Sequence, residues 1–189
     1  LGDTIVDSDI KDLLEEKHST VGIKKVEDPR NFGVAMLDKE DILLELVEKP
    51  NIPKSNLALV GIYKILETEQ LMECLAYNIE NNVQTNGEYH LTDGLDRLVK
   101  KYKVKIKAIT INNWFDLGKR EILLETNAVL LKKYNNDAIK NPAFENTIII
   151  PPVHIAANAK IAHSIIGPNV TIGENVDLEY SILSDSIIG

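Results

Sequence analysis

Apolar and polar positions alternate in short blocks over the first two thirds of the chain. Apolar runs of strand length are separated by polar turns, and three longer stretches carry apolar residues at helical spacing. The polar turn at residues 38–41 separates two of the runs, which predicts a β-hairpin. This alternation predicts an α/β domain. The expected strands are 20–26, 33–37, 42–47 and 57–65, and the expected helices are 67–78, 89–102 and 119–134.

Two weaker patterns lie between these blocks. Residues 10–17 follow helical spacing, and Ser8 or Asp9 is the expected cap of that helix. Residues 103–107 alternate charged and apolar side chains, which is the period of a half-exposed strand. Both patterns are consistent with the α/β rhythm of the longer blocks.

The pattern changes near residue 149. Large aliphatic residues then recur at intervals of 6, 6, 5, 6, 6, 5 and 5, with Gly and Asn at equivalent places between them. A period near six with such corners is typical of a parallel β-helix, in which each repeat forms one side of a triangular coil. The recurring residues are Ile149, Ile155, Ile161, Ile166, Ile172, Leu178, Leu183 and Ile188.

The pattern predicts two domains, at residues 1–140 and 146–189, with a boundary near 135–145 where Asn and Asp interrupt the last helix. The chain begins without Met and ends at Gly189 within a repeat. Because a solenoid needs a capping element, we expect the chain to be an interior piece of a longer protein.

Composition narrows the class of protein. A content of 44% hydrophobic residues is sufficient for a sizeable core, and the net charge of −8 without a long basic run argues against nucleic-acid binding. No apolar stretch approaches the roughly 20 residues that span a bilayer, so we expect no membrane segment. The single cysteine, Cys74, excludes an intramolecular disulfide, fits a cytoplasmic protein and is interpreted as part of the core.

Five short motifs carry the candidate chemistry. Each is weak alone, but their order and the solenoid that follows form a specific combination. The motifs are "LGD" at 1–3, "DPRNFGV" at 28–34, "VEKP" at 47–50, "GEYHLTD" at 87–93 and "WFDLG" at 114–118.

In this order the motifs resemble those of the sugar-1-phosphate nucleotidyltransferases, specifically the long-form glucose-1-phosphate thymidylyltransferases. The segments "PKSNLALVGIY" at 53–63 and "GKREILLETNAVLL" at 118–131 extend the resemblance over essentially the whole chain. The resemblance implies a Rossmann-like nucleotidyltransferase domain on a mixed sheet, of which 1–140 would be the C-terminal part. It also implies that the β-helix is left-handed.

The implied reaction joins a nucleoside triphosphate, dTTP or UTP, to a sugar 1-phosphate, with glucose 1-phosphate the expected sugar. An acidic protein needs a cation between itself and phosphates, and hard carboxylate oxygens suit Mg²⁺. By motif match, Asp3 and Asp116 are the expected catalytic metal ligands, although Asp116 could instead cap the following helix. Lys49 is the expected catalytic cation that meets the sugar phosphate.

The resemblance also implies a sugar pocket. Glu48 would accept hydrogen bonds from sugar hydroxyls, or be a surface carboxylate, and Gly33 would bring its amide to the sugar, or be a hairpin glycine. Glu88 would face the sugar or the start of a helix, and Tyr63 would line the pocket or pack in the core. We interpret the histidines as structural or surface residues: His18, His90, His154 and His163.

The family's glycine-rich loop, which wraps the triphosphate, precedes the "LGD" motif and is not in this sequence. We therefore expect the chain by itself to bind nucleotide poorly and to be inactive. Two other functions remain open: a bifunctional nucleotidyltransferase with an acyltransferase solenoid, and a non-catalytic regulatory or assembly subunit on the same fold. The flat sides and exposed coil edges of the solenoid predict a homo-oligomer.

Overall fold

The computed structural model describes residues 3–118, 120–134 and 144–189. Within them the chain packs into two compact units. Unit 1 is Val6–Trp114, and unit 2 combines the described residues before Val6 with Phe115–Gly189. The expected domain boundary near 135–145 falls almost wholly outside the described residues and stays a prediction.

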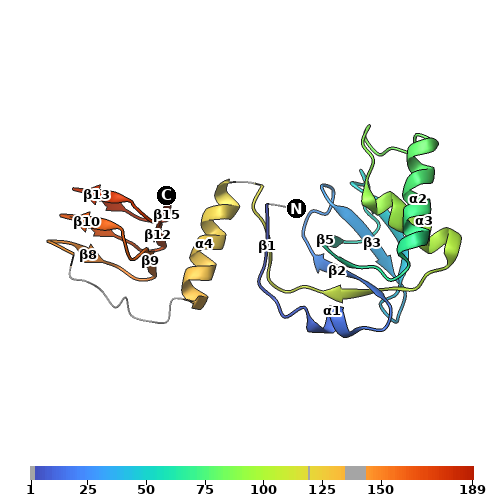
Figure 1. Cartoon of the computed structure of the whole chain (residues 1–189), viewed down its shortest axis with the longest axis horizontal. Coiled ribbons are helices and arrows are strands. Elements are labelled where there is room, and N and C mark those ends of the chain that lie inside the picture. The colour runs from blue at the N-terminus through green and yellow to red at the C-terminus, as the bar shows by residue number, and fades with distance from the viewer. Residues whose placement is uncertain (1–2, 119, 135–143) are drawn as a thin grey trace. The chain divides into compact units, whose positions relative to one another are not determined.

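Unit 1 is built on a mixed five-stranded sheet (Figure 1) with the strand order β4-β3-β5-β2-β6. β2 and β6 are parallel, whereas β2–β5, β3–β5 and β3–β4 are antiparallel. This arrangement confirms the α/β prediction and the hairpin. The strands are β2 (Ser19–Lys25), β3 (Gly33–Leu37), β4 (Leu43–Glu48), β5 (Leu57–Lys64) and β6 (Ile106–Thr110), and the helices are α1 (Lys11–Glu15), α2 (Thr68–Glu80) and α3 (Leu91–Tyr102).

The core of unit 1 lies where α3 packs on the sheet and on α2. Leu95 and Leu98 of α3 are fully buried against Val21 of β2, and Cys74 of α2 is buried with them, as its assignment to the core predicted. Burial raises the pKa of the Cys74 thiol, which keeps it in the neutral form. Gly94 lets the two helices approach closely, because a Cβ there would collide with Leu75.

Two details of the local predictions differ from the structure. Ser8 is not the cap of α1, because its Oγ instead accepts a hydrogen bond from Asn113 N at 3.2 Å. The helix begins after Ile10, and Asp9 Oδ1 accepts from Lys11 N, the first residue of the helix, at 3.0 Å. Lys103 has left-handed backbone (φ 56°) and ends α3, so the strand begins only at Ile106. In both places a contact or a turn outweighs the local sequence preference.

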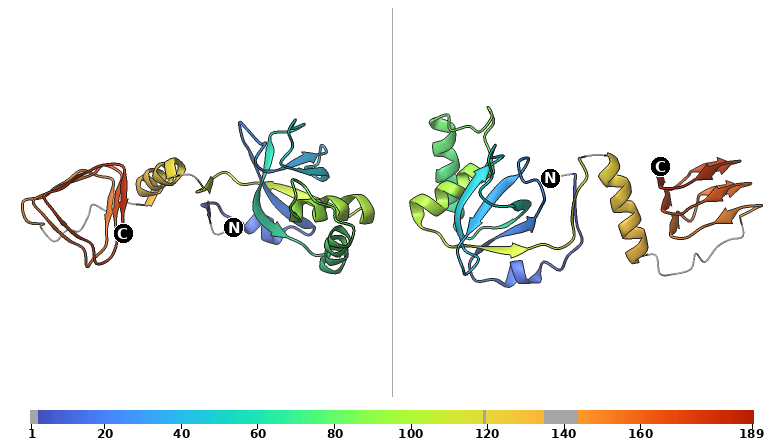
Figure 2. Two further views of the ribbon diagram at one scale, coloured as in Figure 1. Left: turned by 90° about the horizontal axis from the view of Figure 1, so that it is seen from above. Right: turned by 180° about the vertical axis from the view of Figure 1, so that it is seen from behind.

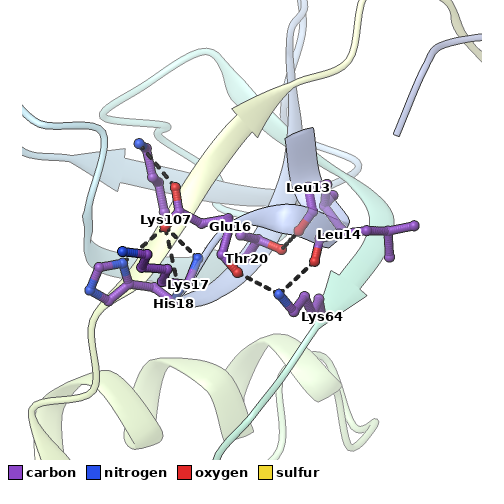
Figure 3. A network of polar contacts seen from close by, with 8 residues as sticks. All are labelled: Leu13, Leu14, Glu16, Lys17, His18, Thr20, Lys64 and Lys107. Carbon is purple, nitrogen blue, oxygen red and sulfur yellow. Dashed lines mark hydrogen bonds and ion pairs between the residues drawn. The ribbon is translucent and has the colours of Figure 1, made fainter. Parts of the chain in front are cut away.

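A polar network ties the end of α1 to the sheet (Figure 3). Glu16 accepts hydrogen bonds from Lys17 N at 2.7 Å and pairs with His18 Nδ1 at 3.1 Å and Lys107 Nζ at 3.2 Å. Lys64 Nζ of β5 donates to the carbonyl oxygen of Glu16 at 2.5 Å. The hydrogen bonds from His18, then Lys107 and Lys17, lower the pKa of Glu16 from 4.5 to about 2.

Replacing Glu16 with Gln should therefore reduce stability in a pH-dependent way. A carboxyl group with a lowered folded-state pKa stabilises the fold fully above pH 4.5 and loses this effect as the pH falls towards 2. In urea unfolding, the free energy of unfolding of Glu16→Gln should be lower than that of the unsubstituted chain at pH 7 and equal to it near pH 2. Glu15→Gln, at the neighbouring exposed position, is the control. An equal deficit at both pH values would contradict the account.

Unit 2 contains α4 (Arg120–Tyr134) and a parallel β-helix whose coils form three faces (Figure 2). Ile148, Ile165 and Ile182 stack in register at steps of 17 residues, as three sides of five to six residues require. The faces are β8-β11-β14, β9-β12-β15 and β10-β13. The strands are β8 (Ile148–Ile149), β9 (Val153–Ile155), β10 (Lys160–Ala162), β11 (Ile165–Ile166), β12 (Val170–Ile172), β13 (Asp177–Glu179), β14 (Ile182–Leu183) and β15 (Ser186–Ile188).

The aliphatic period marks the interior of these coils. Ile161, Ile166 and Ile172 are buried, and the other recurring positions through Leu183 pack against them partly buried. The prediction of a parallel β-helix is confirmed. The helix α4 is joined to the coils through Asn127, which donates to Asn169 O at 3.2 Å and accepts from Thr171 Oγ1 at 2.6 Å.

None of the described helices is long and apolar enough to cross a membrane.

Candidate functional site

Two acidic residues that are distant in sequence meet beside one glycine in unit 2. β1 (Thr4–Val6) pairs with β7 (Trp114–Asp116), and Leu117 N donates to Asp3 O at 2.7 Å. A Cβ built on Gly118 would lie 3.4 Å from Asp116 Oδ1 and 4.0 Å from Asp3 Oδ2. The strand pairing therefore brings the carboxylates of Asp3 and Asp116 to a common point.

The donor set of this acidic pair suits Mg²⁺. Mg²⁺ in phosphate-handling sites is held by one or two carboxylates, with waters and substrate phosphates completing its octahedron. Asp3 is exposed and Asp116 half-buried, and Asp116 Oδ1 also accepts from Gly118 N at 3.3 Å. Within the described ranges, no three His, Cys, Asp or Glu side chains gather to enclose a metal. The pair thus fits a cation that is held jointly with a ligand.

Glu48 is the centre of a second group, in unit 1. It ends β4 opposite Gly33 of β3, and its side chain is only 9% exposed. A Cβ on Gly33 would lie 2.9 Å from Thr92 Oγ1 and 3.0 Å from Glu48 Oε2. A larger residue at 33 would push Glu48 and Thr92 apart, so the glycine is required for this close packing.

Tyr63 of β5 belongs to the same surroundings. Burial, together with the negative charge of Glu48, raises the pKa of the Tyr63 phenol to about 12. The phenol therefore remains a neutral hydrogen-bond donor at physiological pH. Tyr63 also packs against the core of unit 1, as the alternative prediction had it.

Lys49 and Glu88 face each other beside Glu48. Lys49 Nζ lies 3.8 Å from Glu88 Oε2, and both side chains are well exposed. Lys49 has left-handed backbone (φ 40°), and its amide donates to Phe32 O at 3.0 Å, which fixes the direction in which the side chain leaves β4. The ammonium therefore lies beside Glu88 on the exposed side of the group.

A tight turn presents Glu88. Asn86 and Gly87 both have positive φ (54° and 82°), the pattern of a type I′ hairpin turn, and Thr85 and Glu88 exchange backbone hydrogen bonds across it at 3.0 and 3.1 Å. Thr85 Oγ1 donates to Asp93 Oδ2 at 3.1 Å and so attaches the turn to the first turn of α3. Burial raises the pKa of Asp93.

The sequence patterns did not place His90 in the candidate site. Interpreted from the sequence as structural or surface, it lies between two of the candidate residues, with Nδ1 3.6 Å from Glu48 Oε1 and Nε2 3.5 Å from Glu88 Oε2. Its place inside "GEYHLTD", two residues after Glu88, is a signal that the sequence did carry. Metal-ligand spacing gives no signal for this position, because the groups next to the imidazole are carboxylates.

The chain has clear relatives among known proteins. A family model described as nucleotidyl transferase matches residues 2–133. The bifunctional protein GlmU of Methanocaldococcus jannaschii is 40% identical over 159 residues, which are 84% of this chain and 37% of that protein. The glucose-1-phosphate thymidylyltransferase of Streptomyces antibioticus is 32% identical over an alignment of 197 positions, which covers the whole of this chain and 52% of that protein.

A solved structure gives the same result for the fold. A Bacillus anthracis protein described as a glucose-1-phosphate thymidylyltransferase, crystallised with sucrose, aligns with a TM-score of 0.53 and 26% identity. The alignment covers 75% of this chain and 55% of that one. The chain thus spans about half or less of the length of these relatives.

Proposed function

Because the chain belongs to the nucleotidyl transferase family, we propose that the protein containing it makes a nucleotide sugar from a nucleoside triphosphate and a sugar 1-phosphate. An oxygen of the sugar phosphate forms a bond to the α-phosphorus, the bond between the α-phosphorus and its bridging oxygen breaks, and pyrophosphate leaves. The observation that carries the proposal is the approach of Asp3 and Asp116 to one point beside Gly118.

The residues of the two groups divide the work. Asp3 and Asp116 would hold Mg²⁺, which supplies charge neutralisation at the reacting phosphates. Lys49 binds the phosphate of the sugar 1-phosphate as a compact cation on a flexible stem. Positioning and charge neutralisation account for most catalysis of phosphoryl transfer, so no side chain of this chain needs to become a covalent nucleophile.

The group around Glu48 binds the sugar. Glu48 and Glu88 accept hydrogen bonds from sugar hydroxyls, and the neutral phenol of Tyr63 is a donor close to Glu48. Gly33 is buried and lets Glu48 and Thr92 pack close together at this end of the β3–β4 hairpin, because any side chain there would fill the space beside Glu48. In this proposal each candidate residue has one role: it binds the metal ion, the phosphate or the sugar.

For the substrates we favour glucose 1-phosphate with dTTP or UTP, as in the thymidylyltransferase relative that matches the whole chain. A second candidate is supported by the 40% identical bifunctional relative: an aminosugar uridylyltransferase whose β-helix is an acyltransferase. The two candidates share the nucleotidyl transfer. They differ in the sugar and in whether acetyl-CoA is consumed.

An assay of the full-length protein separates these candidates. We expect Mg²⁺-dependent release of pyrophosphate with at least one pairing from a panel of nucleoside triphosphates, glucose 1-phosphate and N-acetylglucosamine 1-phosphate. Release of free CoA from acetyl-CoA with glucosamine 1-phosphate would favour the bifunctional candidate. If no pairing releases pyrophosphate, the non-catalytic subunit becomes the better explanation and the proposed function fails.

A further inference from the structure

His90 has a buried nitrogen that lacks a partner. Its imidazole is 16% exposed, and Nε2 is buried without a hydrogen bond, although Glu88 Oε2 lies 3.5 Å away. That distance is too long for a hydrogen bond. Because a buried polar atom without a partner is unfavourable, a state in which an acceptor moves closer to Nε2 is favoured.

The only acceptor in position to do this, among the described contacts of Nε2, is Glu88. The same Oε2 atom is 3.8 Å from Lys49 Nζ, so Lys49 and His90 compete for one carboxylate oxygen. The Glu88 side chain is 67% exposed and follows a turn, whereas Glu48 is 9% exposed and lies at the end of a paired strand. Glu88 is therefore the movable partner, and Glu48 is the fixed one.

The geometry points to His90 as a positioning residue for the sugar 1-phosphate, an inference that rests on the proposed function. An arriving phosphate binds Lys49 and repels the carboxylate of Glu88. Glu88 then closes on His90, whose Nε2–H donates to it. Lys49 is left to the phosphate, and Glu88 is held where it can accept from the sugar.

The charges around the imidazole suit this role. Glu48 from β4, Glu88 from the turn and Asp93 from α3 are the acidic groups that act on it, and Lys49 is the cation nearby. The neutral tautomer with hydrogen on Nε2 is sufficient to hold Glu88, and the imidazolium would also donate to Glu48. In either form His90 acts through the carboxylates and does not touch the reacting atoms.

The test is a double-mutant cycle in the full-length protein. With glucose 1-phosphate, His90→Ala should raise KM for the sugar about tenfold, while KM for the nucleotide and kcat change less than about twofold. His90→Gln, whose amide can donate from a similar place, should recover most of the loss. In a Glu88→Gln background, His90→Ala should cost less than about threefold, because its partner is already changed.

The outcomes separate this inference from the proposed function. His154→Gln, at an exposed position of the β-helix, is the control and should leave all three constants unchanged. The positioning role is overturned if His90→Ala raises KM for the sugar by the same factor in the wild-type and Glu88→Gln backgrounds. It is also overturned if His90→Ala lowers kcat and the melting temperature and raises KM for both substrates. A wild-type protein that uses no sugar 1-phosphate would instead refute the proposed function, and with it this inference.

Discussion

Replacing Asp116 with Asn in the full-length protein is expected to lower kcat for pyrophosphate release about 10³-fold, or about 4 kcal/mol in activation free energy. The substitution keeps the size of the side chain and removes the negative charge that would hold Mg²⁺ against the phosphates. The strand pairing around Asp116 should persist, because Leu117 N donates to the backbone of Asp3 and not to a side chain. The change should therefore affect catalysis and not folding.

Asp3→Asn should have a similar effect, and the double variant should be little worse than either single one. Groups that hold one ion act as a unit, so their losses do not add. Asp177→Asn, an exposed position on β13, is the matched control and should retain full activity. Equal kcat in Asp116→Asn and the parent protein, at saturating Mg²⁺ and both substrates, would remove the acidic pair from the mechanism.

The β-helix was the part of the fold most accessible to sequence reasoning. Its interior is set by a local repeat, and the residues that recur every five or six positions are those that fill the coils. The strands and the larger helices of unit 1 follow from apolar patterns of similar clarity. By contrast, Ile10 as a cap and Lys103 as a left-handed stop depend on backbone conformations that composition does not reveal.

The candidate site likewise has residues that local motifs indicate and residues that only the tertiary structure brings together. Motif matches indicated Asp3 and Asp116, and in the structure both carboxylates lie within 4.0 Å of the Cβ position of Gly118; their roles stay predictions. The contacts of His90 could not be predicted from the sequence, because they involve three separate segments, namely the end of β4, the Asn86–Gly87 turn and the start of α3. No local window contains these contacts. Only the register of the β3–β4 hairpin places Glu48 where the imidazole can lie against it.

Gly167→Ala is expected to destabilise unit 2 by about 3 kcal/mol, from backbone strain and overpacking together. Gly167 has φ 110°, and a Cβ there would collide with the Ile150 carbonyl oxygen and lie 2.8 Å from Val153 Cγ2. Val153 and the carbonyl of Ile150 belong to the neighbouring coil, where backbone cannot yield without breaking the stack. The collision should therefore loosen the whole solenoid.

Gly87→Ala is the matched control for this prediction. Gly87 also has positive φ (82°), but a Cβ there would meet nothing within 4 Å, so only the conformational cost of about 1 kcal/mol remains. Amide hydrogen exchange in urea would report each unit separately, through Val170 and Ile172 of β12 and through Leu95 and Leu98 of α3. Gly167→Ala should increase exchange in β12 far more than Gly87→Ala does in α3. Similar losses in the two variants would show that strain alone, without the collision, sets the requirement for glycine at the corner of the coil.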